Sequence, residues 1–500
     1  MGTNRRVFLT ALPWLSVGLS GSVRSQDTEA QSVNRFDAVR RMIEAALAAG
    51  KATGLAISLA RDGRIIWQEG FGWANREHGL KATAHTPFPL ASITKPILTT
   101  AIATLAAEGR LGLDEPANRY LGSTPIRASV GADAVTIREL GAHAGGLPSL
   151  FEMYPVAGEV RPPGADEILR AYGAIAYPPG TLYEYSNIGY VALGLIASRV
   201  TGLDISAVIT RRVLEPLGLH DSFFDTDPRR LRQAAARYDE LGRLIPYYTT
   251  ATPASGEVYA SAHDLAQFAL FHLKRGRGVR RPPLSDQWIN SLQVPVLHGP
   301  SAGATTFGWF SGATRSGHAV LFKDGGQPGV STIMYLVPAA GIACVVLANR
   351  TDNSDLAQTL VDLMISGLLP DWSTPDTSMR DPRRPLPATS VYAGRWSGRL
   401  SGGTADIGIE LDIDPTAVMV LRAAQGVLTL SAPELEGAAL VASGTGFFNA
   451  RDVLRLDARK LYLKVLAAPP GLTGRILAVS SSPGTLATLP LTLSAVRSAD

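Results

Sequence analysis

The segment FPLASITKPIL, residues 88–98, places a hydroxyl and an amine three residues apart at the start of an apolar run. On a helix, residues i and i+3 share one face, so the Lys95 ammonium would reach the Ser92 hydroxyl. A helix N-terminus adds free backbone N–H groups and the positive end of the helix dipole. A serine nucleophile and its oxyanion need these features. Taken alone, the segment also fits an ordinary polar helix start.

Two further features of the sequence favour the chemical interpretation. Pro96 has no backbone N–H, which a helix tolerates best in its first turn, so the helix is predicted to begin near Ser92. Lysine is also sparse in this chain, and no other lysine has a serine three residues before it. The other lysines are Lys51, Lys81, Lys274, Lys323, Lys460 and Lys464.

A second polar cluster contains Tyr185 and Asn187, just before an apolar periodic segment that starts at Ile188. A phenol close to ammonium groups has its pKa lowered toward the phenolate. Lowering a tyrosine pKa from ~10 to ~7 takes about 4 kcal/mol, which cations in a dry cleft can supply. Tyr185 would then take the proton of Ser92, while Asn187 would contact a substrate carbonyl and hold Lys95. The alternative is an aromatic residue and a helix-capping amide packed against the core.

A third cluster, Lys323-Asp324-Gly325-Gly326, precedes the strand-like run STIMYLV. A K-x-G pattern on an edge strand lets the backbone of a substrate lie alongside as an added strand. Gly326 is a candidate for a second oxyanion N–H group. A glycine-rich strand entry with a solvated lysine explains the same residues without catalysis.

The motifs S-x-x-K, Y-x-N and K-x-G, in this order, resemble the serine β-lactamase/penicillin-binding-protein-like hydrolases. The similarity is to the branch of class C β-lactamases, D-alanyl-D-alanine carboxypeptidases and family-VIII esterases, and it covers about residues 35–370. Further matching segments are TIRELGAHAGGLPSL (136–150), YEYSNIGYVALGLIASRVTG (183–202), EPLGLHDSFF (215–224), SAHDLAQFAL (261–270) and the turn GGQPGVST.

The resemblance implies a role for each motif residue. Ser92 would be the acylated nucleophile, Lys95 its partner in proton transfer, and Tyr185 the general base and later the acid. The backbone N–H groups of Ser92 and Gly326 would form the oxyanion hole. The implied site comprises catalytic Ser92, Lys95 and Tyr185 and substrate-binding Asn187, Lys323, Gly325 and Gly326, with no metal and no cofactor.

Asp324 departs from the β-lactamase pattern, in which a threonine helps to hold the substrate carboxylate. Many non-lactamase members have His-Gly-Gly here. An acidic side chain would repel a carboxylate or neutralise Lys323. We therefore expect a Ser92 acyl-enzyme acting on small esters, amides or D-amino-acid peptides, as in an esterase or D-amino-acid peptidase. The alternatives are a β-lactamase, a penicillin-binding DD-carboxypeptidase, or a catalytically inactive peptidoglycan-sensing homologue.

Two other candidates lack the context that their chemistry requires. Gly299-Pro-Ser301-Ala-Gly303 matches the G-x-S-x-G nucleophile pattern, but loop and strand signals surround it instead of a strand and a helix. His143 lies at a glycine turn and is interpreted as a structural residue. The histidines form no recognisable metal-binding motif with carboxylates.

The elements that must position these residues suggest an α+β fold. A helix is expected within 33–50, a hairpin at 54–75 around Asp62-Gly63, a second hairpin at 331–349, and a helix over 354–368. Helices and loops fill most of 90–290. This order predicts an antiparallel sheet flanked by helices, with an inserted helical subdomain and a cleft between them.

The chain divides into four predicted segments. Residues 1–25, with Arg5-Arg6 before a short apolar stretch, resemble a twin-arginine export signal, which predicts a periplasmic or otherwise exported protein. Residues 32–370 form the hydrolase domain and 371–388 a Pro-rich linker. Short, evenly spaced β-like runs in 389–500 predict a small all-β barrel or sandwich.

The composition excludes several other classes of protein. The net charge of +4 comes from arginines spread along the chain, so nucleic-acid binding is not expected. No apolar run approaches ~18 residues, so no transmembrane span is expected in the mature protein. The single cysteine excludes an intramolecular disulfide framework. The oligomeric state stays open.

Overall fold

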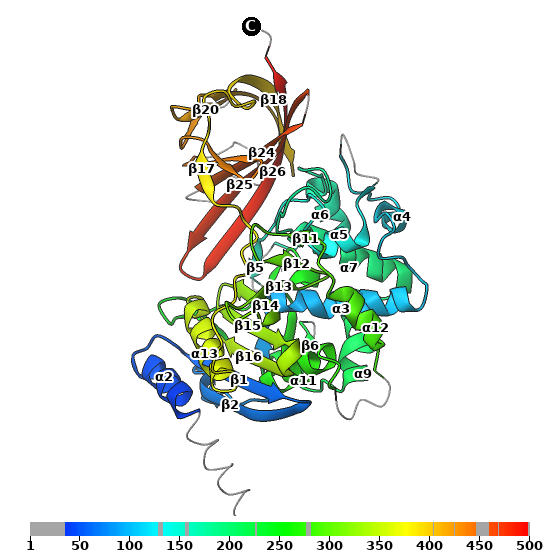
Figure 1. Ribbon diagram of the computed structural model, residues 1–500, viewed down its shortest axis with the longest axis vertical. Coiled ribbons are helices and arrows are strands. Elements are labelled where there is room, and N and C mark those ends of the chain that lie inside the picture. Colours follow the sequence, from blue (N-terminus) through cyan, green and yellow to red (C-terminus); the bar gives the residue numbers. More distant parts are fainter. Residues whose placement is uncertain are drawn as a thin grey trace, which may run out of the picture.

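The computed structural model describes residues 36–498 apart from 129–133, 156–159, 226–227, 277–281, 404, 425, 447–459 and 469. Two bodies follow one another along the chain, a helix-flanked sheet domain and a C-terminal β-barrel (Figure 1). The predicted export signal, 1–25, and the strand-like run DVLRLDA lie outside the described residues.

The central sheet joins the two ends of the first domain. Its strand order is β11-β12-β13-β14-β15-β16-β1-β2-β3, and the neighbours pair antiparallel. β1 lies between β2 and β16, with Leu55 opposite Ala348. The strands are β1 (Gly54–Arg61), β2 (Arg64–Asn75), β3 (Leu80–Lys81), β11 (Leu297–His298), β12 (Ala304–Thr305), β13 (Phe310–Ala313), β14 (Ala319–Gln327), β15 (Val330–Val337) and β16 (Ile342–Ala348).

Helices cover both faces of this sheet, which explains why its central strands are apolar throughout. Along β1, Leu55 and Ile57 pack into one cluster together with α2 (Asp37–Ala48) and α13 (Ser354–Ser366). Ala56 and Ala60 point the other way, into the cluster that contains α11 (Ala262–His272). A strand buried on both faces has no polar side and reads as a continuous hydrophobic run.

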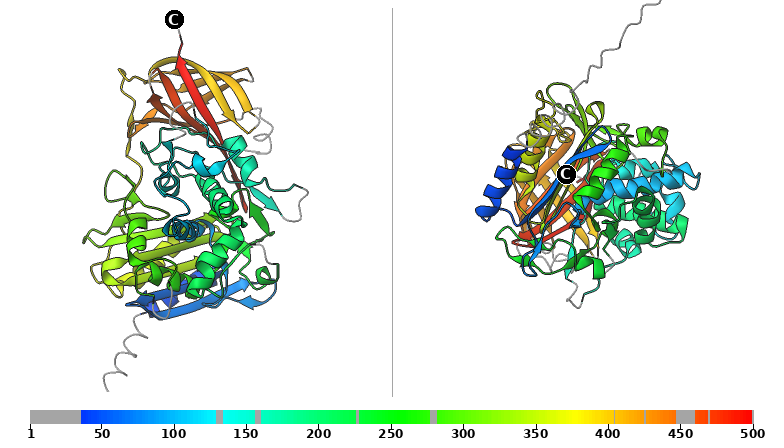
Figure 2. Two further views of the ribbon diagram at one scale, coloured as in Figure 1. Left: turned by 90° about the vertical axis from the view of Figure 1, so that its right-hand side faces the viewer. Right: turned by 90° about the horizontal axis from the view of Figure 1, so that it is seen from below.

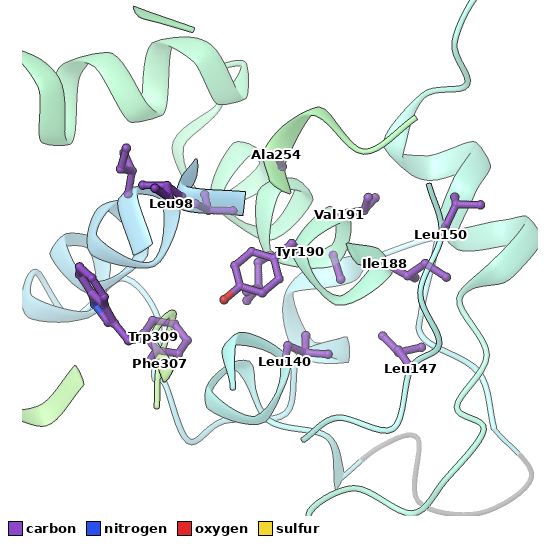
Figure 3. Packing of buried hydrophobic residues seen from close by; sticks show 14 of the residues in the cluster. Leu98, Leu140, Leu147, Leu150, Ile188, Tyr190, Val191, Ala254, Phe307 and Trp309 are labelled. Atoms are coloured by element: carbon purple, nitrogen blue, oxygen red, sulfur yellow. The ribbon is translucent and has the colours of Figure 1, made fainter. Parts of the chain in front are cut away.

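The inserted subdomain is built around α3 (Thr94–Ala107) and α7 (Asn187–Thr201). Figure 3 shows Leu98, Leu140 and Phe307 around the ring of Tyr190, whose hydroxyl donates to the Gly141 carbonyl at 2.7 Å. The other helices here are α4 (Asn118–Leu121), α5 (Ile137–Gly141), α6 (Ala165–Tyr172), α8 (Ile205–Ile209), the π-turn η3 (Thr210–Leu214), α9 (Glu215–Leu217), α10 (Pro228–Leu231) and α12 (Asp286–Leu292).

Short strands support the loops between these helices. β4 (Phe88–Pro89), β10 (Val258–Ala260) and β6 (Phe223–Phe224) form a small sheet beside the start of α3. Two further pairs are β5 (Met153–Pro155) with β9 (Tyr248–Thr250), and β7 (Arg237–Tyr238) with β8 (Leu244–Ile245). The expected α+β architecture, with its two hairpins and inserted helices, is confirmed.

The C-terminal domain is a closed barrel, one of the two predicted forms. Eight strands form its ring, because β18 pairs with β26 and β23 pairs with β24. Buried and exposed residues alternate along β19, as expected where one face lines a packed interior. The ring strands are β18 (Gly394–Gly402), β19 (Ala405–Ile413), β20 (Met419–Ala423), β21 (Gly426–Leu430), β23 (Ala439–Thr445), β24 (Lys460–Ala468), β25 (Gly471–Ser482) and β26 (Thr485–Arg497).

The segment 371–388 is more ordered than its composition indicates. Within it, β17 (Arg383–Pro385) pairs with β22 (Glu434–Glu436) at the side of the barrel. Asp376 forms a bridge with Ala313 of the sheet domain. Proline is compatible with such edge strands, because a strand edge has backbone groups outside the ladder. The expected linker therefore lies against both domains.

The barrel is docked on the sheet domain through buried polar contacts. Arg475 of β25 donates from Nε to Glu184 Oε1 at 2.7 Å, and these side chains are only 9% and 5% exposed. Thr488 of β26 and Phe151 exchange two backbone hydrogen bonds of 2.7 and 3.0 Å. Figure 2 shows the β25–β26 hairpin descending from the barrel beside the helical subdomain. The hairpin thus joins the two domains.

Among the described residues, no single helix has the length and apolar character needed to cross a membrane. One bent pair, Asn187–Thr201 with Ile205–Leu217, meets these criteria only when its two members are taken together.

Candidate active site

Ser92 lies in a short 3-10 turn, η1 (Ala91–Ile93), which runs directly into α3. Pro96 falls in the first turn of α3, so the helix begins where its missing N–H predicts. The preceding residue, Ala91, has a φ of +47°, in the left-handed region that non-glycine residues rarely adopt. Such conformations cluster at functional sites, where the surrounding structure holds them in place.

Lys95 carries a fully buried ammonium group with three acceptors. Its Nζ donates to Ser92 Oγ at 3.1 Å, to Asn187 Oδ1 at 2.8 Å and to the Ser255 carbonyl at 3.2 Å. Each of the three N–H bonds therefore has a partner, which a buried cation requires. Burial lowers the pKa of Lys95 to about 8, against the opposing effect of Tyr185. The group is still mainly protonated at neutral pH.

Tyr185 places its hydroxyl 2.7 Å from Ser92 Oγ. Burial alone would raise the pKa of Tyr185, but the charges of Lys323 and Lys95 outweigh it and bring the pKa below its usual value. The two ammonium nitrogens lie 5.4 and 4.9 Å from the centre of the phenol ring. The phenolate therefore forms more easily here than in a free tyrosine.

His143 supports the tyrosine and does not take part in the hydrogen bonds around Ser92. Its ring stacks on Tyr185, with centroids 4.2 Å apart, and its Nδ1 accepts from the Ser186 backbone N–H at 3.1 Å. Burial, then the charges of Lys95 and Lys323, keep the pKa of His143 well below its usual value. A neutral, buried imidazole in this place fits the structural role expected from the sequence.

Asn187 is the first residue of α7, behind the N-cap Ser186. Its Oδ1 accepts from Lys95, and its Nδ2 donates to the Leu150 carbonyl at 3.0 Å. The amide still lines the cavity in front of Ser92. One N–H of the amide is therefore used to hold the loop at Leu150, and the other is left for a ligand.

β14 brings the third motif to the opposite wall. The sequence suggested an edge strand, and this is wrong, because β14 lies between β13 and β15 inside the sheet. However, its pairing with β13 ends at Phe310 opposite Phe322. Residues 323–327 consequently have no strand partner on that side among the described residues. The stretch is a local edge within an interior strand.

Lys323 is buried under the strand, and its Nζ donates to Asp324 Oδ1 at 3.1 Å. Burial lowers the pKa of Lys323, whereas Tyr185 and Asp324 raise it. The net result is a pKa above the usual value for lysine. Burial raises the pKa of Asp324, but Lys323 outweighs burial and holds it below the usual range. The Asp324 side chain is 61% exposed and lines the cavity, so an ionised carboxylate faces any bound molecule.

Gly325 and Gly326 differ sharply in their surroundings. A Cβ at Gly325 would lie 2.1 Å from the Leu90 carbonyl oxygen and 3.2 Å from the Ser92 nitrogen. β14 therefore packs against η1 so closely that only glycine fits. A Cβ at Gly326 would have no atom within 4 Å, and this residue lines the cavity.

The site opens into a cavity of about 350 Å³. The structure brings the motif residues together around it, with Lys95 and Lys323 below its surface. The sequence analysis did not identify several of the lining residues, because they come from separate loops, strand ends and the barrel and are not part of the three motifs. These are Phe151, Tyr183, Thr250, Thr252, Ser255, Gly256, Phe310, Gln327 and Leu486.

The alternative serine of the G-x-S-x-G pattern has no such surroundings. Ser301 is exposed and donates to Asp376 at 2.6 Å. It follows the two-residue strand β11 and precedes β12, so the strand-to-helix turn of a nucleophile elbow is missing.

Replacing Gly325 by alanine should push β14 away from η1, since no real Cβ fits 2.1 Å from a carbonyl oxygen. We expect Gly325→Ala to reduce the free energy of unfolding by about 1–3 kcal/mol, the usual range for overpacking. Gly326→Ala is the matched control and should unfold near the temperature of the original protein. Equal melting temperatures for the two variants would contradict the close approach.

Comparison with known proteins shows which family the chain belongs to. The Beta-lactamase family model matches residues 39–369. Protein flp of Staphylococcus aureus strain N315 is 26% identical over 336 residues, which are 65% of this chain and 64% of flp. Esterase EstB of Burkholderia gladioli is 33% identical over 210 residues, 39% of this chain and 53% of EstB. The chain thus aligns with less than two thirds of either relative's length.

A solved structure extends the similarity in fold beyond the sheet domain. The octameric penicillin-binding protein homologue from Pyrococcus abyssi superposes with a TM-score of 0.56 at 22% identity, covering 94% of this chain and 99% of the homologue. At this identity the match concerns the fold. Since the family model covers well over half of the sequence, the family predicted from the three motifs is confirmed, and the chain belongs to the β-lactamase family of serine hydrolases.

Proposed function

We propose that this protein hydrolyses esters or amides through an acyl-enzyme at Ser92, as an esterase or a D-amino-acid peptidase does. The observation that carries the proposal is the contact of one serine hydroxyl with two complementary groups. Ser92 Oγ lies 2.7 Å from the Tyr185 phenol and 3.1 Å from the Lys95 ammonium.

The proton route follows from these two contacts. Tyr185, whose pKa is lowered by the neighbouring lysines, takes the proton of Ser92 as the oxygen attacks the substrate carbonyl. Lys95 remains an ammonium and stabilises the negative charge that moves between the two oxygens. Tyr185 then returns the proton to the leaving alcohol or amine, and the acyl group stays on Ser92.

The second half of the reaction uses the same groups. A water molecule attacks the acyl carbonyl while Tyr185 removes a proton from the water. Collapse of the tetrahedral intermediate returns a proton to Ser92 Oγ and releases the acid. We assign the oxyanion to the backbone N–H groups of Ser92 and Gly326, which line the same cavity on η1 and β14.

The free stretch of β14 supports peptide-like substrates among the candidates. Residues 323–327 offer backbone groups beside the nucleophile, and an extended substrate can pair with them as a short strand. This observation favours the D-amino-acid peptidase form of the proposal. An ester needs no such pairing, so the esterase form depends on the cavity alone.

Asp324 acts against substrates with a carboxylate next to the scissile bond. Its ionised side chain faces the cavity, and its contact with Lys323 neutralises the cation that would otherwise attract that carboxylate. Like charges in one site repel each other. We therefore expect lower rates of hydrolysis for β-lactams than for neutral esters and amides.

The first test is the loss of Ser92. We expect Ser92→Ala to lower the hydrolysis of short-chain nitrophenyl esters by a factor of about 10⁴ or more, as removal of a nucleophile does elsewhere. A fluorophosphonate probe should label Ser92 in the original protein, as read by peptide mass spectrometry. Ser301→Ala is the matched control and should leave both readouts unchanged. If the protein is folded but its Ser92 peptide stays unlabelled, the hydrolase proposal is wrong and the chain is a catalytically inactive homologue.

The second test concerns Asp324. Removing one like charge from the cavity should favour carboxylated substrates by about 1–1.5 kcal/mol, or roughly tenfold. We expect Asp324→Asn and Asp324→Thr to raise the rate for nitrocefin about tenfold relative to that for nitrophenyl acetate. Nitrocefin turnover by the original protein that rivals its ester turnover would contradict this role.

A further inference from the structure

The β25–β26 hairpin of the barrel reaches the cavity in front of Ser92. Leu486, near the tip of this hairpin, lines the cavity together with Ser92, Tyr185 and Phe151. It is the one barrel residue among the described residues that does so. Figure 1 shows the hairpin extending out of the barrel toward the sheet domain near β5. The catalytic cavity is therefore enclosed by two domains.

Contacts on both sides fix Leu486 in its place. Two residues after it, Thr488 exchanges two backbone hydrogen bonds with Phe151, of 2.7 and 3.0 Å. Two residues before it, Gly484 donates from its backbone N–H to Glu240 Oε2 at 3.4 Å, and a Cβ at this glycine would lie 3.4 Å from Ile245. The tip of the hairpin is thus held by the sheet domain and cannot be treated as a free loop.

A buried ion pair holds the same hairpin beside the catalytic tyrosine. Arg475 on β25 binds Glu184, the residue before Tyr185, with 2.7 Å between the atoms. Lys464 of β24 lies 3.9 Å from the same carboxylate. Separating such a buried pair leaves uncompensated charges, which is costly. The hairpin therefore has a defined position relative to the Ser92–Tyr185 pair.

Leu486 adds an apolar side chain to a mixed lining. Phe151, Tyr183 and Phe310 are further large lining residues, and the polar ones include Thr250, Thr252 and Gln327. The volume of about 350 Å³ is near the lower end for ligand pockets, so one leucine side chain occupies a significant share of the available space. Leu486 is half-buried, which means that the barrel core does not depend on its full side chain.

We propose that Leu486 of the barrel hairpin limits the size of the acyl group on Ser92, so that the site takes short acyl groups. This inference rests on the proposed function and adds the acyl class to it. The acyl group stays attached to Ser92 through both half-reactions, so a wall of the cavity contacts it throughout. The leaving group departs after acylation and is less restricted by this wall.

The test measures kcat/KM for nitrophenyl acetate, butyrate and octanoate with the full chain. Leu486→Ala removes three carbon atoms and should raise the octanoate-to-acetate ratio about tenfold or more, since one methylene in an apolar pocket already has effects of this order. Leu486→Trp should lower the same ratio. Val496→Ala is the matched control, because Val496 lies on the same strand, is 55% exposed and does not line the cavity.

Each outcome has one meaning. Opposite shifts of the ratio in the two Leu486 variants support the proposal. If Ser92 reacts with a fluorophosphonate but the ratio stays constant, or if all esters change equally, the acyl-limiting role is wrong while the hydrolase proposal stands. Phenyl and alkyl acetates share an acyl group and differ in the leaving group. If the Leu486 variants change only the relative rates of these acetates, the acyl-limiting role is wrong as well. If wild-type Ser92 does not react at all, both proposals fail.

Discussion

Two buried lysine ammonium groups beside one phenol are the constraint on which the rest of the structure depends. Lys95 and Lys323 are both buried, and their ammonium nitrogens lie 4.9 and 5.4 Å from the centre of the Tyr185 ring. Buried cations are costly unless each donor finds an acceptor. Asn187, Ser255 and Asp324 supply oxygen atoms for that purpose. The same cations make Tyr185 a better proton acceptor.

The fold satisfies this constraint by bringing three remote segments to one point. η1 and α3 carry Ser92 and Lys95, the start of α7 carries Asn187, and β14 carries Lys323. Gly325 allows β14 to approach η1, and Thr332 of β15 donates to the Leu90 carbonyl at 2.9 Å. The sheet thereby fixes the distance between the two lysines, while the barrel hairpin closes the cavity from the other side.

Local patterns predicted the parts of this arrangement that depend on nearby residues. The Asp62-Gly63 turn, the apolar runs of β15 and β16, and the first turn with Pro96 all follow from short-range rules, and the structure has them. The motif residues were found because their types and spacing are characteristic of the family. The short, evenly spaced β-like runs in 389–500 indicated a barrel or a sandwich and left the choice open.

Features that depend on contacts between remote segments were not predictable in the same way. Whether β14 has a free edge depends on how far its pairing with β13 extends. The sequence of neither strand predicts that this pairing stops at Phe310 opposite Phe322. The strand β17 required the barrel edge at β22, which its Pro-rich sequence does not reveal. Leu486 reaches the cavity because two domains dock, and an isolated leucine in a β-like run carries no sign of it.

The central claim is that the two lysines lower the pKa of Tyr185 and so make it a better proton acceptor for Ser92. The most direct measurement is the pKa of its phenol by NMR of ζ-¹³C-labelled tyrosine, with Tyr185→Phe used to assign the signal. Since the charges of Lys323 and Lys95 outweigh burial, the signal should titrate below the value of ~10 for free tyrosine, and Lys323→Ala should move it upward. A titration above ~10 in the original protein would contradict the account.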